Sequence, residues 1–431
     1  MTETSHALLE RLYRIAVAAA HPSVCLPPHL PAPPSGGKLV ILAAGKAAGS
    51  MAEAAERFYL DTVHLPPERI TGLAVTRHGY GRPTRIIRMV EAGHPVPDQA
   101  GLDATADVLR LAEAAGSNDL VLVLMSGGAS ANWVAPAAGL TLADKQGVTR
   151  ALLASGAGIG EINTVRKHLS RIKGGRLAAA AWPAPLITLA ISDVPGDDPA
   201  VIGSGPTVAD PTTLADASEV LQRYGVTPSV DVAKALADPA SETVKADHPA
   251  MASTSFQIVA RPAESLAAAE AAAREAGFEV LMLGDRLEGE ARTVAAEHAR
   301  LARDMREQGR RVALLSGGEL TVTLRGTGRG GPNQEYALAL AIALDGLPGV
   351  SAVAGDTDGT DGGGGNPDDP AGAIIGPTTL ARARSLGLDP AAFLANNDST
   401  GFFERLGDLL RPGPTFTNVN DFRVILVGDP D

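Results

Sequence analysis

Short, continuous runs of Val, Ile and Leu alternate with helical segments from Lys38 onward, and this alternation constrains the fold more than any other feature. The strongest strands are expected within 38–47, 119–130, 184–194 and 311–322. A strand that is apolar at nearly every position is buried on both faces, as in a parallel sheet covered by helices on each side. The sequence therefore predicts an α/β protein whose ligands bind beyond the carboxyl ends of its strands.

Two interruptions divide the chain. Residues 4–20 have the spacing of an amphipathic helix, and residues 21–37 then contain six prolines and end on two glycines, which is typical of a stiff surface connector. The segment 208–252 is helical, more polar and rich in loop residues, and we expect a domain boundary near its end. The prediction is two domains, 1–250 and 251–431.

Composition excludes several classes of protein. The 431 residues carry a formal net charge of -12, which argues against nucleic-acid binding because that function needs a basic face. The single cysteine, Cys25, excludes a disulfide framework and a cysteine-rich metal site. The first residues lack the apolar core of a signal peptide, and no apolar run approaches the length of a membrane span. We expect a cytoplasmic protein that binds neither nucleic acid nor membrane.

The tripeptide Ser-Gly-Gly follows an apolar strand twice, at Ser126–Gly128 and at Ser316–Gly318. Glycine lets backbone N–H groups approach an anion closely, and the serine hydroxyl adds a donor. Two tight strand-to-loop turns would use the same residues, and the motif alone does not separate the two interpretations.

Lys46 comes just after the first strand, at the start of the predicted helix 47–59. The surrounding LAAGKAAGS is not a GxxxxGK[ST] phosphate-binding loop, because its first glycine is missing and Ala47 stands in place of Ser or Thr. A lysine at a helix N-terminus opposes the helix dipole unless an anion is bound there. We therefore expect Lys46 to contact an anion.

A basic island interrupts this acidic chain, and it contains Arg166, Lys167, Arg171, Lys173 and Arg176. A solvated helix face is the ordinary explanation of such a run. Against it, Asn163, Lys167 and Ser170 share one helical face, and Gly174-Gly175 interrupts the helix for no structural reason that the sequence shows. An anion-facing cluster is the favoured interpretation.

Asp193 comes at the carboxyl end of the buried strand 184–194, where α/β enzymes hold catalytic groups. Its carboxylate could accept a proton from an alcohol or hold Mg²⁺. Turn and capping chemistry explains the following Asp197 and Asp198, but it explains Asp193 less well.

A second group of carboxylates, Asp356, Asp358 and Asp361, lies in the loop VAGDTDGTDGGGG. The loop begins like a calcium-binding EF-hand, but Thr360 occupies the third ligand position and no glutamate closes it. It suits Mg²⁺ with bound waters, or contacts to ribose and phosphate, and a plain Gly/Asp loop is the alternative.

Gly326, Gly328 and Gly331 have the G-x-G-x-x-G spacing of a dinucleotide-binding loop between a strand and a helix. However, the strand has a polar face, and no acidic residue follows about twenty positions later inside a second strand. The loop N–H groups and Arg325 or Arg329 are therefore expected to hold phosphates, with the first turn of the next helix facing the site.

Two histidines, His94 and His168, are isolated in the sequence, so no Ser-His-Asp order can be assigned. His94 follows a glycine and precedes two prolines in EAGHPVPD, which holds it rigidly. It could touch a ligand there, but a structural loop histidine is the favoured interpretation.

Taken together, these stretches resemble the class II glycerate 2-kinases, the MOFRL-type family. The resemblance rests on AAGKAAGSMAEA, EAGHPVPD, LMSGGASANW, EINTVRKHLSRIKGGRLA, ISDVPGDDPAVIGSGPTVADP, LLSGGELTVTLRGTGRGGPNQEYALA, AGDTDGTDG and TNVNDFRVILV, in family order. It implies ATP-dependent phosphorylation of D-glycerate at its 2-hydroxyl to give 2-phosphoglycerate, with Mg²⁺. It also implies a larger N-terminal Rossmann-like domain, a smaller C-terminal α/β domain of MOFRL type, and an active site in the cleft between them.

The resemblance assigns the catalytic lysine and aspartate of the family to Lys46 and Asp193. Some members carry an arginine where this chain has Pro332, so that phosphate contact does not carry over, and Arg329 is the expected substitute. Phosphoryl transfer needs mostly positioning and charge neutralisation, which glycine loops, cations and Mg²⁺ provide. One Ser-Gly-Gly is expected to hold the nucleotide phosphates, and the other the glycerate carboxylate or the transferred phosphoryl group, in an order that the sequence leaves open.

Three sets of site residues follow from this assignment. Those expected to bind the substrate or its phosphoryl group are Ser126, Gly127, Gly128, Ser130, Arg166, Lys167, Ser204, Arg325 and Arg329. Those expected to bind the nucleotide are Ser316, Gly317, Gly318, Glu319, Asn333, Gln334, Glu335 and Asp356. The expected metal ligands are Asp193, Asp358 and Asp361.

Two other functions compete with this one. An NAD(P)-dependent hydroxypyruvate reductase is a label that such sequences also carry, and it rests on the glycine spacing discounted above. A non-enzymatic sensor of small anions is disfavoured, because Lys46, Asp193 and the aspartates around Asp356 supply more candidate catalytic groups than a sensor needs.

Overall fold

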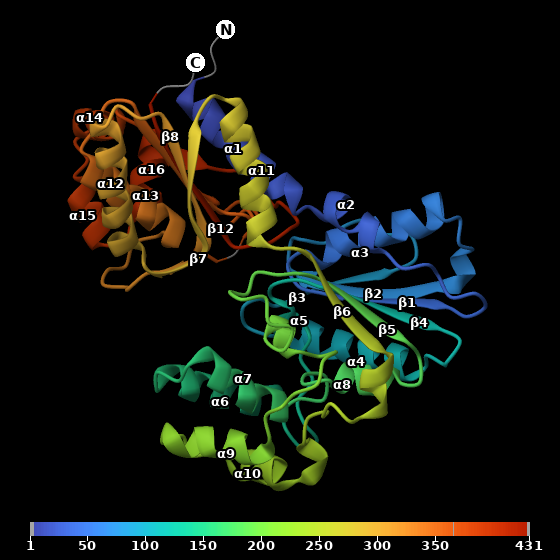
Figure 1. Cartoon of the computed structure of the whole chain (residues 1–431). Helices are drawn as coiled ribbons and strands as arrows, with labels where there is room; N and C mark the ends of the chain where they lie inside the picture. The colour runs from blue at the N-terminus through green and yellow to red at the C-terminus, as the bar shows by residue number, and fades with distance from the viewer. Residues whose placement is uncertain (1–3, 365, 429–431) are drawn as a thin grey trace. The chain divides into compact units, whose positions relative to one another are not determined.

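The computed structural model describes residues 4–364 and 366–428, and it divides into two compact units (Figure 1). The N-terminal unit runs from Cys25 to Val259. The C-terminal unit takes the chain from Ala260 onward together with the residues up to Val24. Each unit is built on its own sheet with helices around it, so the predicted α/β class is confirmed. Within the described residues, no helix combines the length and the apolar composition that crossing a bilayer requires.

The sheet of the N-terminal unit has the strand order β3-β2-β1-β4-β5-β6. Its strands are β1 (Leu39–Ala44), β2 (Ile70–Arg77), β3 (Arg88–Ala92), β4 (Leu120–Met125), β5 (Leu186–Ile191) and β6 (Thr254–Ala260). The neighbours from β3 to β5 are all paired in parallel. Every residue of β1 and β4 is buried, as their continuous apolar sequence predicts.

Helices cover both faces of this sheet, with α3 on one face and α4 and α8 on the other (Figure 1). The helices of this unit are α3 (Ala48–Arg57), α4 (Gln99–Glu113), α5 (Ala129–Asn132), α6 (Leu142–Ala154), α7 (Ile159–His168), α8 (Arg176–Ala181), α9 (Leu214–Arg223) and α10 (Val230–Ala237), and the short helix α2 (Pro22–Cys25) lies across the boundary between the units. On the second face, Val108 and Leu177 pack against Val40 and Leu42 of the central strand. Helices α6, α7, α9 and α10 form a separate group around a core of their own.

The strand order reverses between β1 and β4, and this point positions the candidate site. Loops that leave neighbouring parallel strands at such a reversal run in opposite directions and open a crevice. Ala44 pairs with Met125, and Met125 pairs with Ala190, so β1, β4 and β5 end nearly level. Lys46 and Asp193 follow two of these strand ends directly, and they therefore lie at the same edge of the sheet as the first Ser-Gly-Gly.

The sheet of the C-terminal unit has the order β11-β10-β9-β12-β8-β7. Its strands are β7 (Glu279–Glu290), β8 (Val312–Thr321), β9 (Val350–Asp356), β10 (Gly372–Ile375), β11 (Leu409–Leu410) and β12 (Asp421–Val427). Only the pair β7–β8 is parallel among the described pairs, and the others are antiparallel. The prediction of a parallel sheet is therefore wrong for this unit. A strand that is covered on both faces is apolar at every position whether its neighbours are parallel or antiparallel, so its sequence does not show the direction of pairing.

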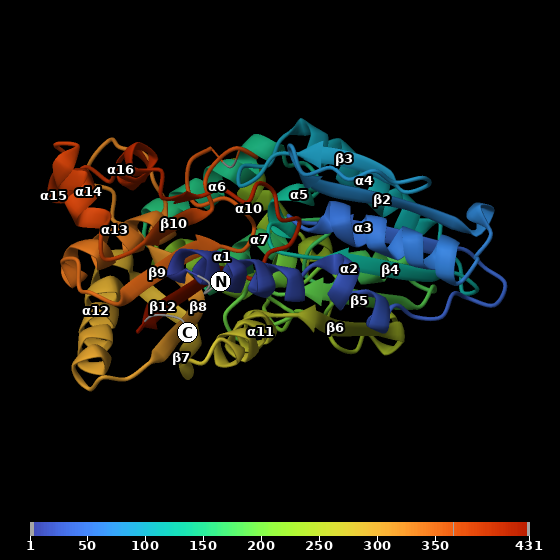
Figure 2. The same ribbon diagram turned by 90° about the horizontal axis from the view of Figure 1, so that it is seen from above.

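Two layers of helices enclose the C-terminal sheet (Figures 1 and 2). On one face lie α12 (Ala291–Glu307), α13 (Pro332–Leu344), α14 (Thr379–Ser385), α15 (Pro390–Ala395) and α16 (Ser399–Leu406), and on the other lie α1 (Ser5–Ala19) and α11 (Pro262–Glu275). Leu12 and Tyr13 of α1 are buried in this second layer, and the Tyr13 hydroxyl donates to the Asp356 carbonyl at 2.7 Å.

The predicted boundary at residue 250 differs from the observed division in two places. Helix α1, placed by the prediction with residues 1–250, belongs to the C-terminal unit. Strand β6, placed by the prediction beyond the boundary, completes the N-terminal sheet. An amphipathic pattern shows that one face of an element is buried, but it does not show which partner buries it.

Candidate active site

The loops that follow β1 and β4 are hydrogen-bonded to each other. The Lys46 N–H donates to the Gly127 carbonyl at 2.7 Å, and the Ala47 N–H donates to the Ser126 Oγ at 2.9 Å. Gly45 has a φ of +119°, and a Cβ there would stand 2.4 Å from the Ser126 Oγ, so only glycine fits. Ser126 is 0% exposed and joins the two loops, so its contacts are structural, in contrast to its predicted role with a ligand.

Gly128 lies where the side chains of His94 and Lys46 converge. It has a φ of +86°, and a Cβ there would stand 2.9 Å from the His94 Cδ2 and 3.3 Å from the Lys46 Cγ. Glycine is therefore required both by the left-handed backbone and by the lack of room. His94 follows β3, and its side chain borders the space beside Lys46. The sequence favoured a purely structural loop role for this histidine. Spacing along the chain could not reveal this approach, because it depends on the sheet order.

Two backbone donors lie in the same loop. The N–H groups of Gly127 and Gly128 have no acceptor within the described residues, whereas the Ser126 N–H donates to the Ala44 carbonyl and the Ala129 N–H to the Ser126 carbonyl. Backbone N–H groups beside a lysine and an imidazole are an arrangement suited to an anion.

Ser130 of α5 is the centre of a second cluster. Its Oγ lies 2.7 Å from the Arg166 Nη2, 2.8 Å from the Lys173 Nζ and 2.9 Å from the Ser204 Oγ. A serine hydroxyl accepts two hydrogen bonds, so the two cations fill its acceptor sites and its own proton is directed to Ser204. The structure thus brings together Ser130, Arg166 and Ser204, which come from distant segments and were each predicted to bind the substrate. Lys173 joins them at the same hydroxyl.

The turn that carries Ser204 has a left-handed backbone. Gly203, Ser204 and Gly205 have φ angles of +59°, +65° and +58° in succession. The N–H groups of Gly174 and Gly175 donate to the carbonyls of Ser204 and Gly205 at 3.1 and 2.8 Å. The glycine pair therefore has a structural purpose that the sequence did not show.

The basic island points in two directions. The Lys167 Nζ lies 3.4 Å from the Asp210 Oδ1 in a buried ion pair, while Arg166 and Lys173 face Ser130. Lys167 is thus turned away from Ser130 and toward Asp210, and its predicted contact with the substrate stays a prediction. Helical spacing shows which residues share a face, but it does not show which face turns toward the site.

A cavity of about 440 Å³ lies beside α5, between α6, α7 and the segment after His94. Lys145, Arg166 and Lys173 line it. Burial, together with the charges of Arg166 and Arg176, lowers the pKa of Lys145 to about 7. Burial also lowers the pKa of Lys173 and that of Arg166. The cavity thus gathers three basic side chains, each with a lowered pKa.

Sequence reasoning included Lys173 in the basic island but assigned no role to Lys145, although a signal for Lys145 exists. Lys145 shares the buried side of α6 with Val148 and Leu152, at a spacing of three and seven residues. A lysine in an apolar stripe is rarely buried unless it meets a partner. The apolar spacing of α6 therefore marks Lys145 as a candidate binding residue.

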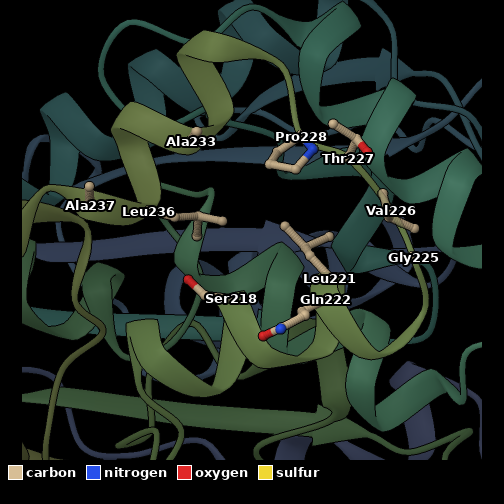
Figure 3. Close-up of a pocket in the computed structure, with 10 residues that line it drawn as sticks. All are labelled: Ser218, Leu221, Gln222, Gly225, Val226, Thr227, Pro228, Ala233, Leu236 and Ala237. Carbon is tan, nitrogen blue, oxygen red and sulfur yellow. The ribbon is translucent and has the colours of Figure 1, made fainter.

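A second hollow, of about 450 Å³, lies between α9 and α10 (Figure 3). It is lined by Ser218, Leu221, Gln222, Gly225, Val226, Thr227, Pro228, Ala233, Leu236 and Ala237. None of these side chains carries a charge, so this hollow offers no group that would select an anionic substrate.

The second Ser-Gly-Gly is not a loop. Ser316–Gly318 lie inside β8, where the Arg423 Nη2 donates to the Gly317 carbonyl at 2.8 Å. Gly318 has a φ of +101°, and a Cβ there would stand 2.2 Å from the Leu287 N of β7. The phosphate loop predicted at Ser316, Gly317 and Gly318 is therefore wrong, because these residues serve the close, irregular pairing of β7 with β8. The predicted nucleotide contact of the next residue, Glu319, stays a prediction.

The glycine-rich loop before α13 is held by residues 396–398. The N–H groups of Arg325 and Gly326 donate to the Asn397 Oδ1 at 2.7 and 2.9 Å, and the Arg329 N–H donates to the Asp398 Oδ1 at 3.1 Å. These N–H groups are used within the protein, which disfavours a phosphate contact for them, and the phosphate role predicted for the loop stays a prediction. The side-chain roles of Arg325 and Arg329 stay predictions.

The first turn of α13 faces the protein interior. Asn333, Gln334 and Glu335 are at most 2% exposed. The N–H groups of Asn333 and Gln334 donate to the Asp361 carboxyl at 3.0 and 2.8 Å, and Glu335 pairs with Arg292 at 2.7 Å. Burial of α13 and the internal pairing of these polar residues disfavour a contact with the nucleotide, and the predicted contact stays a prediction.

The aspartates after β9 are engaged in local hydrogen bonds. The Asp358 Oδ1 accepts from the N–H and the hydroxyl of Thr360, and the Asp356 Oδ1 accepts from the Asp358 N–H. Burial raises the pKa of Asp361 to about 7, so this carboxyl keeps its proton below neutral pH. In the ranges that the structure covers, no group of three or more His, Cys, Asp or Glu side chains is placed to hold a metal ion.

Comparisons with known proteins give a consistent set of relatives. Residues 8–237 match a domain of unknown function, DUF4147, and residues 312–421 match the MOFRL family. A protein of Agrobacterium vitis, named provisionally as a hydroxypyruvate reductase, is 47% identical over 98% of this chain and 94% of its own length. A glycerate 2-kinase of Pyrococcus horikoshii is 40% identical over 91% of this chain and 88% of its own length. The crystal structure of a glycerate kinase from Thermotoga maritima is 38% identical, covers 98% of this chain and 99% of that chain, and has a TM-score of 0.86.

Replacing Gly318 with alanine should destabilise the protein more than the same change at Gly309. Both positions are left-handed, which costs an alanine about 1–2 kcal/mol, but a Cβ at Gly309 meets nothing within 4 Å. At Gly318 the new methyl must also displace the β7 backbone, so the free energy of unfolding should fall by about 1–3 kcal/mol more. Chemical denaturation measures both values. Equal losses would contradict the packing role of Gly318.

Proposed function

This chain belongs to the MOFRL-type glycerate 2-kinase family, and from that premise we propose that its N-terminal unit binds D-glycerate where the strand order reverses. The enzyme transfers a phosphoryl group from ATP to the 2-hydroxyl of D-glycerate and releases 2-phosphoglycerate. The observation that carries the proposal is the convergence of Lys46 and His94 on the donor loop Gly127–Gly128 at that edge.

We assign the transferring phosphoryl group to the donor loop. Negative charge is spread over the phosphoryl oxygens during transfer, and fixed donors aimed at it lower the barrier. The Lys46 ammonium and the N–H groups of Gly127 and Gly128 supply such donors. Their positions are set before the substrate arrives, because the hydrogen bond from the Lys46 N–H to the Gly127 carbonyl fixes one loop on the other. His94 borders the same space and limits where the phosphoryl group can lie.

Asp193 is assigned to the 2-hydroxyl of glycerate. It follows β5, the neighbour of β4, and it is half-buried. An alcohol is a poor nucleophile at neutral pH, and a carboxylate placed to accept its proton contributes about 10²–10⁴-fold to the rate.

Mg²⁺ fits this chain as a partner of the nucleotide phosphates. Asp361 does not fit as a ligand, because its carboxyl is occupied by the start of α13 and keeps its proton below neutral pH. Mg²⁺ usually takes one or two protein carboxylates, waters and substrate phosphates, and Asp193 suits that pattern. When bound, Mg²⁺ would neutralise charge on the phosphates. Asp358 as a ligand, and Glu319 and Asp356 as nucleotide contacts, stay predictions.

Purified protein incubated with D-glycerate, ATP and Mg²⁺ should form 2-phosphoglycerate, detected by phosphorus NMR, with one ADP released for each product. With hydroxypyruvate and NADH or NADPH it should show no reductase activity, because the glycines that resemble a dinucleotide loop are packed against Asn396, Asp398 and Asp361. Reduction of hydroxypyruvate without any phosphoryl transfer would refute the kinase assignment.

The Asp193→Asn variant should bind ATP normally and lose turnover by about 10²–10⁴-fold, since the amide keeps the size of the side chain and removes its charge. Steady-state kinetics and calorimetric nucleotide binding measure the two effects, with the melting temperature as a check of folding. Asparagine serves turns nearly as well as aspartate, so activity within a few-fold of wild type would mean that Asp193 only forms a turn.

The Gly128→Ala variant should lose most of its activity, while Gly139→Ala should keep it. Both glycines have left-handed backbones, with φ of +86° and +80°, so both variants carry a similar strain. Only the methyl at Gly128 meets His94 and Lys46, whereas a Cβ at Gly139 meets nothing within 4 Å. Kinase assays on the matched pair separate the two effects, and equal activities would count against a catalytic role for the donor loop.

A further inference from the structure

The basic cavity beside α5 contains three cations and an apolar wall. Lys145, Arg166 and Lys173 supply the charges. Its other lining residues include Val96, Val134, Leu142 and Leu153, and Arg150 lies at its exposed rim. A volume of about 440 Å³ is in the usual range of small-molecule sites.

The three cations have no carboxylate partner within the described residues. The Lys145 Nζ donates to the Arg166 carbonyl at 3.3 Å, and the Lys173 Nζ donates to the carbonyl and the Oγ of Ser130 at 2.8 Å each. The Arg166 guanidinium donates to the same Oγ and to the Asn163 Oδ1. All of these acceptors are neutral, so the positive charges are uncompensated.

A third buried lysine of the described residues, outside the cavity, does have an opposite charge. Lys167, one residue from Arg166, is buried to a similar degree as Lys145 and is paired with Asp210. Burying several like charges without an opposite charge is costly. The cavity is therefore built for an anion that comes from outside the chain.

The cavity also adjoins the donor loop. Ser130 lines it and lies two residues after Gly128, and Pro95 lines it next to His94. A molecule that reaches both places must carry one anionic group in the cavity and its reacting group at the donor loop. A free phosphate ion cannot join the two places, which favours a carboxylic acid whose hydroxyl is the reacting group.

We propose that this cavity is the subsite for the substrate carboxylate, with Lys145, Arg166 and Lys173 as its binding residues. The inference rests on the proposed function, since it takes the glycerate hydroxyl to lie at the donor loop. It assigns Lys145 and Lys173 a role in choosing a 2-hydroxy acid over a neutral alcohol, because only a carboxylate compensates their charge.

Proton uptake is a consequence that can be measured. The charged groups that face Lys145 are Arg166 on α7, Lys173 in the following loop and Arg176 on α8, and all are cationic. Their repulsion and the burial hold the pKa of Lys145 near 7. A bound carboxylate favours the charged form and raises that pKa. Lys145 should therefore take up a proton on binding above neutral pH, and it should take up little below pH 7, where it is already charged.

The test is calorimetric titration of D-glycerate into the full-length protein without nucleotide, at about pH 8 and about pH 6. Two buffers of different ionisation enthalpy give the number of protons taken up. Wild-type protein should take up more protons than Lys145→Gln at the higher pH, and the two should differ little at the lower pH, because any uptake by Lys173, whose pKa burial also lowers, is common to both. Lys145→Gln should bind glycerate about 10- to 100-fold more weakly and take up fewer protons.

Two further variants control this comparison. Lys145→Arg keeps the charge but does not titrate, so it should bind within a few-fold of wild type and also take up fewer protons. Lys234→Gln, at a lysine whose side chain is 74% exposed on α10, should match wild type in both respects. Melting temperatures identify any variant that fails to fold.

The possible failures are distinguishable. If wild-type protein phosphorylates glycerate while Lys145→Gln and Lys173→Gln bind it with unchanged affinity and proton uptake, the subsite is refuted and the kinase stands. If glycerate binding needs these lysines but no phosphoryl transfer occurs with ATP, the kinase assignment fails and the subsite stands. Inorganic phosphate that binds tightly and depends on Lys145, while glycerate binding does not, would also refute the carboxylate assignment.

Discussion

The hydrogen bond from the Lys46 N–H to the Gly127 carbonyl joins the two loops that leave the sheet where its strand order reverses, and the candidate site depends on it. The bond is possible because β1 and β4 pair in parallel with Ala44 opposite Met125, so that the two loops begin level. A shift of one residue in that register would turn every side chain to the other face of the sheet. Left-handed glycines at the start of each loop then allow the close approach.

Electrostatics adds a second constraint to this geometry. The donor loop and the basic cavity both concentrate positive charge in a chain whose net charge is -12. Within the part of the chain that the structure describes, the buried cations of the cavity have no carboxylate partner, which opposes folding and favours the bound state of an anion. Polar contacts such as that of Lys173 with Ser130 hold the cations in place without neutralising them. The site is therefore organised before the substrate arrives, and the substrate supplies the missing charge.

Sequence reasoning succeeded where one physical rule decided the outcome. Continuous apolar runs predicted the parallel strands of the N-terminal unit, and the rule for the carboxyl ends of such strands placed Lys46 and Ser130 at one edge. It failed where the role of a residue depends on which distant segments of the chain pack against it. Ser316 lies in a mixed sheet whose apolar strands look the same as parallel ones. Gln334 is hydrogen-bonded to Asp361 in the protein interior. Lys145 points into a cavity that forms only when α6 packs against α7.

A crystal structure of this protein in complex with 2-phosphoglycerate tests the central claim most directly, because the product carries both the carboxylate and the phosphoryl group. The account predicts that a carboxylate oxygen lies within hydrogen-bond distance of the Lys173 Nζ or the Arg166 guanidinium. It also predicts that the phosphoryl oxygens accept from the N–H groups of Gly127 and Gly128. Product bound elsewhere, with only water in the basic cavity and at the donor loop, would contradict the account.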